Sequence, residues 1–106
     1  MNLDINQNVN IFYNNPNQFQ QIMRTQRLIR KLDEVYLIDG SSNIILSDLL
    51  DKSANFYAPS EEMFTQALSG IPAQSNDLDL EFTSALIKLN NFIDTYLYII
   101  KYIDPQ

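Results

Sequence analysis

The stretch Asp94-Thr-Tyr-Leu-Tyr-Ile-Ile-Lys-Tyr-Ile-Asp-Pro105 decides the fold of this chain. Residues 95–103 are almost all β-branched, aromatic or leucine, which is the composition of a strand buried on both faces of a sheet. Pro105 cannot continue a strand ladder, because proline has no backbone N–H. We therefore expect a final strand here that is buried on both faces, with further sequence following it in a longer parent protein.

The residues just before this strand predict its partners. Residues 83–89 form another extended run, and residues 90–94 suit a turn, so the two runs should pair antiparallel. Asp77-Leu-Asp-Leu-Glu-Phe82 alternates between acidic and apolar residues, which predicts a strand with one apolar face. We interpret residues 71–76 as a connection.

The acidic face of that alternating segment has two explanations. Asp77, Asp79 and Glu81 could together bind a divalent cation, because hard cations prefer several carboxylate oxygens at short range. Alternatively, they form a solvated edge whose charges discourage aggregation between strands.

The N-terminal third of the chain predicts a helix. Asn15 is a favourable N-cap and Pro16 fits the first helical position, so the helix should begin there. Its core-facing stripe would comprise Phe19, Ile22, Met23, Ile29 and Leu32, whereas Arg24, Arg27, Arg30 and Lys31 would form a solvated flank. Residues 1–15 would be a helix end or linker, and residues 16–105 the domain.

The middle of the chain predicts a hairpin and a second helix. Residues 35–39 and 44–47 read as strands around a Gly40 turn, residues 48–58 as a long connection, and Ser60 to Gly70 as a short helix with its cap and stop. The resulting order is typical of an α+β, PAS-like (PDC/Cache-type) single domain. It would have a central antiparallel sheet, an N-terminal helix and one short helix.

Composition excludes several functions. The chain of 106 residues has a net charge of −6, which argues against a nucleic-acid surface. It contains neither His nor Cys, so imidazole bases, thiol nucleophiles and the commonest zinc sites are excluded. Its two glycines form no phosphate-binding loop. We therefore expect no enzyme activity and no cofactor in this chain.

Several segments resemble one family, the extracytoplasmic region of nitrogen-regulation (NtrY-like) sensor histidine kinases. The resemblance rests on Asn15-Pro-Asn-Gln-Phe19, Thr25-Gln26, Leu32, Tyr36-Leu-Ile-Asp-Gly40, Ile44-Ile-Leu46, Leu89-Asn-Asn-Phe-Ile-Asp-Thr-Tyr-Leu-Tyr98 and Tyr102-Ile-Asp-Pro105.

This resemblance implies the signal-input (sensor) domain of a membrane-bound, two-component sensor histidine kinase. The domain would be a periplasmic segment of a bacterial inner-membrane protein, and a homodimer in the parent. The kinase part, with its ATP, magnesium and response-regulator partner, would lie outside this chain.

The resemblance supplies no set of ligand-binding residues, so geometry alone suggests candidates. If the sheet pairs as expected, a small-molecule or ion ligand would contact the final strand and its neighbours through Tyr36, Lys88, Tyr96, Tyr98 and Lys101. Core packing is the alternative explanation for each tyrosine. Two further functions stay open: a ligand-free scaffold or dimerisation domain, and a divalent-cation sensor using the three acids.

Overall fold

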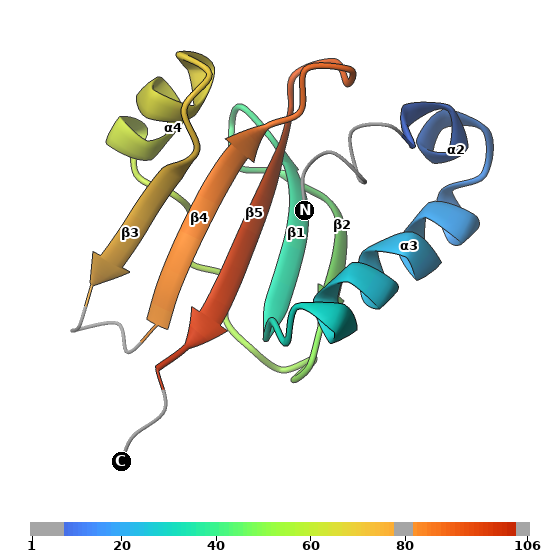
Figure 1. Cartoon of the computed structure of the whole chain (residues 1–106), viewed down its shortest axis with the longest axis horizontal. Helices are drawn as coiled ribbons and strands as arrows, with labels where there is room; N and C mark the ends of the chain where they lie inside the picture. The colour runs from blue at the N-terminus through green and yellow to red at the C-terminus, as the bar shows by residue number, and fades with distance from the viewer. Residues whose placement is uncertain (1–7, 78–81, 104–106) are drawn as a thin grey trace.

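The structure, a computed structural model of the chain, describes residues 8–77 and 82–103. Its elements follow in the order α2 (Val9–Asn14), α3 (Pro16–Ile29), β1 (Glu34–Asp39), β2 (Ile44–Leu49), α4 (Glu61–Leu68), β3 (Ala73–Asp77), β4 (Phe82–Lys88) and β5 (Thr95–Tyr102). They form an α+β fold with one antiparallel sheet (Figure 1).

The five strands of the sheet lie in the order β2-β1-β5-β4-β3. The last strand, β5, is therefore central and pairs with β1 on one side and β4 on the other. This confirms the buried final strand and the antiparallel pair that the sequence predicted. In Figure 1, β5 lies between β4 and β1, with α3 at the β1–β2 end of the sheet and α4 at the β3 end.

The two faces of the sheet carry separate cores. On the α3 face, Phe19 and Met23 of the helix pack against a cluster formed by Val35, Leu37, Leu89, Phe92 and Leu97. On the α4 face, Met63 and Ala67 pack against a cluster that includes Tyr36, Ile38, Phe82, Leu86, Tyr96, Tyr98 and Ile100. Alternation along β1 and β5 sends successive side chains to opposite cores.

Both predicted helix starts are confirmed by capping contacts. The side-chain oxygen of Asn15 accepts a hydrogen bond from the backbone N–H of Gln18 at 3.2 Å, with Pro16 in the first turn. The Ser60 hydroxyl likewise accepts from the N–H of Met63 at 3.2 Å. These caps satisfy backbone donors that the first turn of a helix leaves free.

Four sequence predictions were wrong. Residues 71–76 are not merely a connection, because β3 begins at Ala73, and the predicted strand over 77–82 is divided between the end of β3 and the start of β4. Ile29 does not face the core: it is the last residue of α3 and is exposed. Arg27 is not solvated but buried. Residues 78–81 lie outside the described part of the chain.

Two turns meet at one end of the sheet. The Asp39 carboxylate accepts hydrogen bonds from the backbone N–H groups of Ser41 and Asn43, which closes the β1–β2 turn. Opposite it, Asp94 adopts a left-handed φ of 47° before β5. A Cβ atom on Gly40 would lie 2.8 Å from Oδ1 of Asp94, so a larger residue here would require the Asp94 side chain to shift where the two turns approach each other.

Candidate functional site

The tyrosines of β1 and β5 form a buried aromatic cluster on the α4 face. Tyr36 lies opposite Tyr98 in the sheet register, and both contact the ring of Phe56 from the connection between β2 and α4. The Tyr98 hydroxyl donates a hydrogen bond of 2.8 Å to the backbone carbonyl of Tyr57. This bond fastens the long connection to the central strand, and burial raises the pKa of Tyr98.

A carboxylate lies beneath this cluster at the first residue of β1. Glu34 is only 3% exposed. The Tyr36 hydroxyl donates a hydrogen bond of 2.5 Å to one oxygen of its carboxylate, and the Tyr102 hydroxyl donates a hydrogen bond to the other oxygen. Burial, followed by the hydrogen bond to Glu34, raises the pKa of both Tyr36 and Tyr102. Both phenols therefore stay protonated, and the arrangement acts as a structural link rather than an acid–base pair.

The preceding residue reinforces this link. The N–H of Asp33 donates to the carbonyl of Ile100 at 3.0 Å, and Oδ2 of Asp33 accepts from the N–H of Tyr102 at 2.7 Å. Asp33, Glu34 and Tyr102 together form what we call the carboxylate link. It joins the segment that follows α3 to the C-terminal end of β5.

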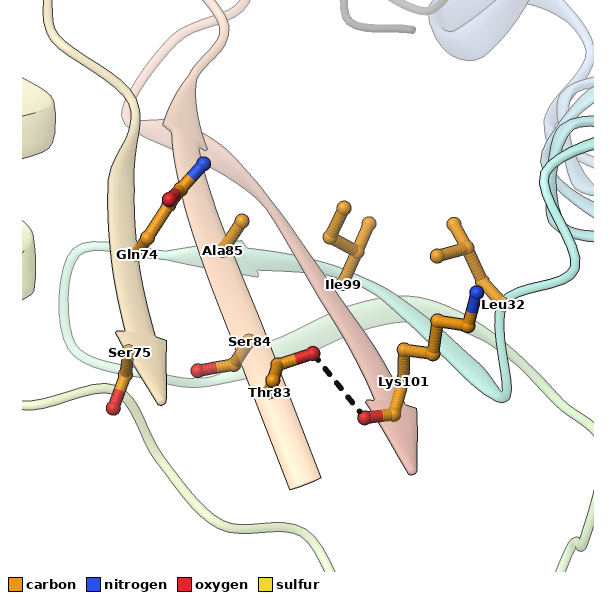
Figure 2. A pocket seen from close by; sticks show the side chains of 8 residues that line it. All are labelled: Leu32, Gln74, Ser75, Thr83, Ser84, Ala85, Ile99 and Lys101. Atoms are coloured by element: carbon orange, nitrogen blue, oxygen red, sulfur yellow. Dashed lines mark hydrogen bonds between the residues drawn. The ribbon is translucent and has the colours of Figure 1, made fainter. Parts of the chain in front are cut away.

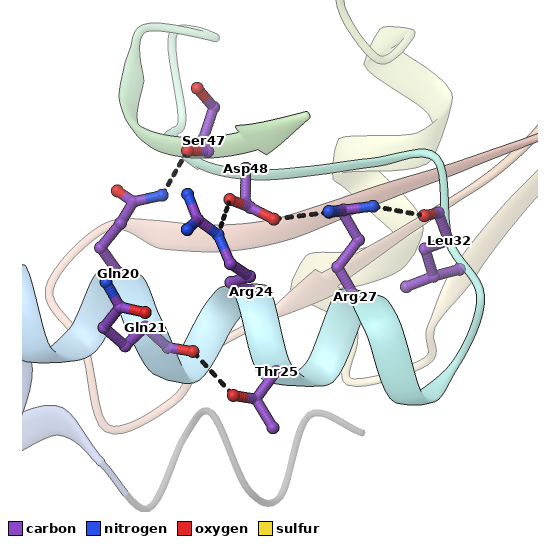
Figure 3. Close-up of polar contacts among 8 residues, drawn as sticks. All are labelled: Gln20, Gln21, Arg24, Thr25, Arg27, Leu32, Ser47 and Asp48. Carbon is purple, nitrogen blue, oxygen red and sulfur yellow. Dashed lines mark hydrogen bonds and ion pairs between the residues drawn. The ribbon is translucent and has the colours of Figure 1, made fainter. Parts of the chain in front are cut away.

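Helix α3 is itself attached to β2 by a buried ion pair (Figure 3). Asp48 accepts from Nε of Arg27 at 2.5 Å and from Nε of Arg24 at 3.2 Å. Gln20 adds a hydrogen bond of 2.6 Å to the carbonyl of Ser47. Helix α3 is thus attached to the sheet by apolar side chains, such as Phe19 and Met23, and also by the polar side chains of Gln20, Arg24 and Arg27.

A groove of about 550 Å³ opens on the α3 face, beside the area that the helix covers. Its lining residues are Leu32, Gln74, Ser75, Thr83, Ser84, Ala85, Ile99 and Lys101 (Figure 2). They come from β3, β4, β5 and the segment after α3.

The five predicted ligand residues divide between the two faces. Tyr36, Tyr96 and Tyr98 belong to the α4-face core, and the Lys88 ammonium lies 5.3 Å from the centre of the Tyr96 ring. Lys101 instead lines the groove on the opposite face, so the five do not converge on one cavity.

Sequence reasoning missed Asp33, Glu34 and the groove. Glu34 alternates with Tyr36 at the start of a predicted strand, which was the available signal for a carboxylate on the tyrosine face.

The cation-site hypothesis stays a prediction. Asp79 and Glu81 lie outside the described residues, as does the side chain of Asp77. Within the part that is described, no group of three or more acidic side chains is arranged to hold a metal ion.

The chain is similar over its full length to one curated relative. The match is to the nitrogen regulation protein NtrY of Azorhizobium caulinodans, with 23% identity over 106 residues. The chain spans 14% of the length of that relative. No family model matches the chain. Across residues 8–77 and 82–103, none of the helices has the length and apolar character needed to cross a bilayer.

Proposed function

We propose that this chain is the signal-input domain of an NtrY-like, membrane-bound sensor histidine kinase of a two-component system. The observation that carries the proposal is the similarity to NtrY along the whole chain. The strand order β2-β1-β5-β4-β3, with α2 and α3 on one face and α4 on the other, supports a PAS-like assignment of the PDC/Cache type. A periplasmic position, a homodimeric parent and a response-regulator partner belong to the same proposal. ATP and magnesium would be used by a kinase domain elsewhere in the parent.

The carboxylate link suggests how such a domain passes on a signal. A ligand or local condition shifts a two-state equilibrium only if it interacts differently with the two states. Movement of α3 relative to the sheet would reach β5 directly, because Asp33 and Glu34 bind both the backbone and the side chain of Tyr102. In this mechanism a displacement of the segment after α3 is passed to the C-terminal end of β5 through the carboxylate link.

The test is a chimaera in which residues 1–106 replace the matched segment of Azorhizobium caulinodans NtrY. Removing the Tyr102 hydroxyl with Tyr102→Phe should change autophosphorylation of the chimaera in membranes by about 2- to 30-fold, since residues that couple sites contribute about 0.5–2 kcal/mol. Tyr57→Phe is the matched control, because the hydrogen bond to that residue uses its backbone carbonyl and not its hydroxyl.

Two results would contradict the proposal. One is a chimaera with the same activity as NtrY carrying an unrelated insert of equal length. The other is an equal effect of Tyr57→Phe and Tyr102→Phe. Thermal unfolding of the 106-residue variants checks that neither change merely unfolds the domain.

A further inference from the structure

The groove on the α3 face is a consequence of how the helix and the sheet fit. Helix α3 packs on β2 and β1, as Figure 1 shows, and the groove lies in the remaining area on the β3 and β4 side of the same face. One row of side chains crosses this open area, because the register aligns Gln74 with Ala85 and Ala85 with Ile99. Ala85, in the middle of the row, carries only a methyl group.

The two sides of the groove differ in chemistry. Ile99 and Ala85 supply an apolar floor, and Leu32 forms a wall on the side of α3. Thr83 lies opposite Lys101 in the register, and its hydroxyl donates to the Lys101 carbonyl at 3.4 Å. In Figure 2 the Lys101 side chain extends along the groove toward Leu32. The Gln74 amide lies at the other side, two strands away.

The charge in the groove is opposite to that of the chain as a whole. None of its eight lining residues is acidic, although the chain has a net charge of −6. The Lys101 ammonium has no ion-pair or hydrogen-bond partner among the described residues. Oδ2 of Asp33 accepts a hydrogen bond from the backbone N–H of Tyr102, and Asp33 is not one of the residues that line the groove. A lysine above an apolar floor is suited to bind an anion that also carries an apolar body.

We propose that this groove binds a small organic carboxylate with an apolar body, its acid group on Lys101 and a polar group at the far end on Gln74. Two strand spacings, roughly 10 Å, separate the backbones of β3 and β5. Gln74 aligns with Ala85 and Ile99, and Lys101 aligns with Thr83 two residues further along, so a monocyclic aromatic acid with a polar para substituent would cross the groove diagonally between the two side chains. The volume of about 550 Å³ also lies within the usual size of small-molecule sites. This inference deepens the proposed sensor function and rests on it for the role of the ligand.

The experiment titrates the 106-residue chain with 4-hydroxyphenylacetate by calorimetry and by amide NMR. Saturable binding is expected, with chemical-shift changes at Thr83, Ala85, Ile99 and Lys101. The neutral isostere 4-hydroxyphenylacetamide and inorganic phosphate should each bind at least about tenfold more weakly, because the amide lacks the negative charge and phosphate lacks the apolar body.

Three variants locate the site. Lys101→Met should weaken binding about tenfold by removing a charge-assisted contact. Ala85→Leu should abolish binding by filling the groove. Lys52→Met removes an equal charge from the exposed connection and should leave the affinity unchanged. Lys101 is exposed, so its variant keeps the test valid even if Ala85→Leu fails to fold.

The proposal is overturned by any of three results. The first is the absence of saturable binding at about 10 mM acid, a concentration at which a site with a Kd of 1 mM would be close to saturation. The second is binding of the amide or of phosphate as tight as that of the acid. The third is an unchanged affinity for the acid in Lys101→Met. The chimaera described above separates this site from the sensor function. Binding without any response of kinase activity to the acid would contradict the sensor role and leave the groove intact. A signalling chimaera whose input domain does not bind the acid would contradict the groove alone.

Discussion

Replacing Asp48 with asparagine should strongly destabilise the domain, because it removes the carboxylate that pairs with two arginines of α3. Asp48 is 5% exposed, and Arg27, its closest partner, has a side chain that is 10% exposed. The substitution keeps the volume of the side chain but leaves the guanidinium of Arg27 buried without its counter-charge. The second partner, Arg24, is 48% exposed and remains hydrated.

The expected magnitude follows from this difference in burial. Removing one member of a buried ion pair costs about 3–5 kcal/mol, and we expect about 3 kcal/mol here because Arg27 retains a contact of 3.4 Å with the carbonyl of Leu32. Arg24→Ala should cost less than about 1 kcal/mol, as is usual for an exposed pair. For a domain of this size, about 3 kcal/mol corresponds to a fall in Tm of roughly 12–24 °C.

Urea unfolding followed by circular dichroism at pH 7 measures these values. Asp48→Asn should lower the midpoint by roughly 1–3 M with an unchanged slope. The double variant Arg27→Met with Asp48→Leu is the control, because an apolar pair of similar volume often replaces a buried ion pair without loss. The reasoning is refuted if Asp48→Asn costs no more than Arg24→Ala, or if the double variant is as unstable as Asp48→Asn.

Three further predictions concern the turns and the tyrosines. Gly40→Ala should lower the free energy of unfolding by about 1 kcal/mol, because its Cβ would lie 2.8 Å from Oδ1 of Asp94 and displace that side chain, and the same substitution should cost less in an Asp94→Ala background, which removes the clashing oxygen, as thermal unfolding of the four proteins would show; an equal cost in both backgrounds would disprove the clash. The raised pKa values of Tyr36 and Tyr102 mean that their contribution to stability is full below pH 10 and is lost as the pH rises through the folded-state values, so unfolding measured from pH 8 to 12 should ease above pH 10; Tyr102→Phe should reduce this alkaline loss, and an identical profile would count against the shift. Hydrogen bonds from the Asn43 backbone and side chain and from the Ser41 backbone hold the pKa of Asp39 below 3.8, so its contribution is present above pH 3.8 and is lost as the pH falls through the folded-state value; an NMR titration midpoint at or above 3.8 would be inconsistent with these bonds.

Elements with strong local signals were predicted correctly from the sequence. The Asn15-Pro16 start of α3 and the Ser60 cap of α4 depend on hydrogen bonds within one helical turn. The apolar density of β5 likewise marks a strand wherever it lies in the sheet. The structure of such elements is determined by residues close to one another in the sequence, so it can be predicted from the sequence alone.

Elements defined by distant partners were not predictable in the same way. The sequence of β3, Ala-Gln-Ser-Asn-Asp, has little β propensity, and pairing with β4 makes it a strand. Arg27 and Asp48 look like surface residues until the fold brings α3 against β2. The groove depends on the row of residues across three strands, which no local pattern reveals.

The central position of β5 has a consequence for biosynthesis. Strand β1 leaves the ribosome early, but one of its two partners is the last strand to be made, and their paired residues are separated by most of the chain. Contacts of such long sequence separation slow folding, because the loop between them must close before the contacts form. Without β5, the β1–β2 and β3–β4 pairs would have no strand between them, and the edges that pair with β5 in the complete sheet would be open. The nascent domain would therefore depend on protection from aggregation until its final strand is synthesised.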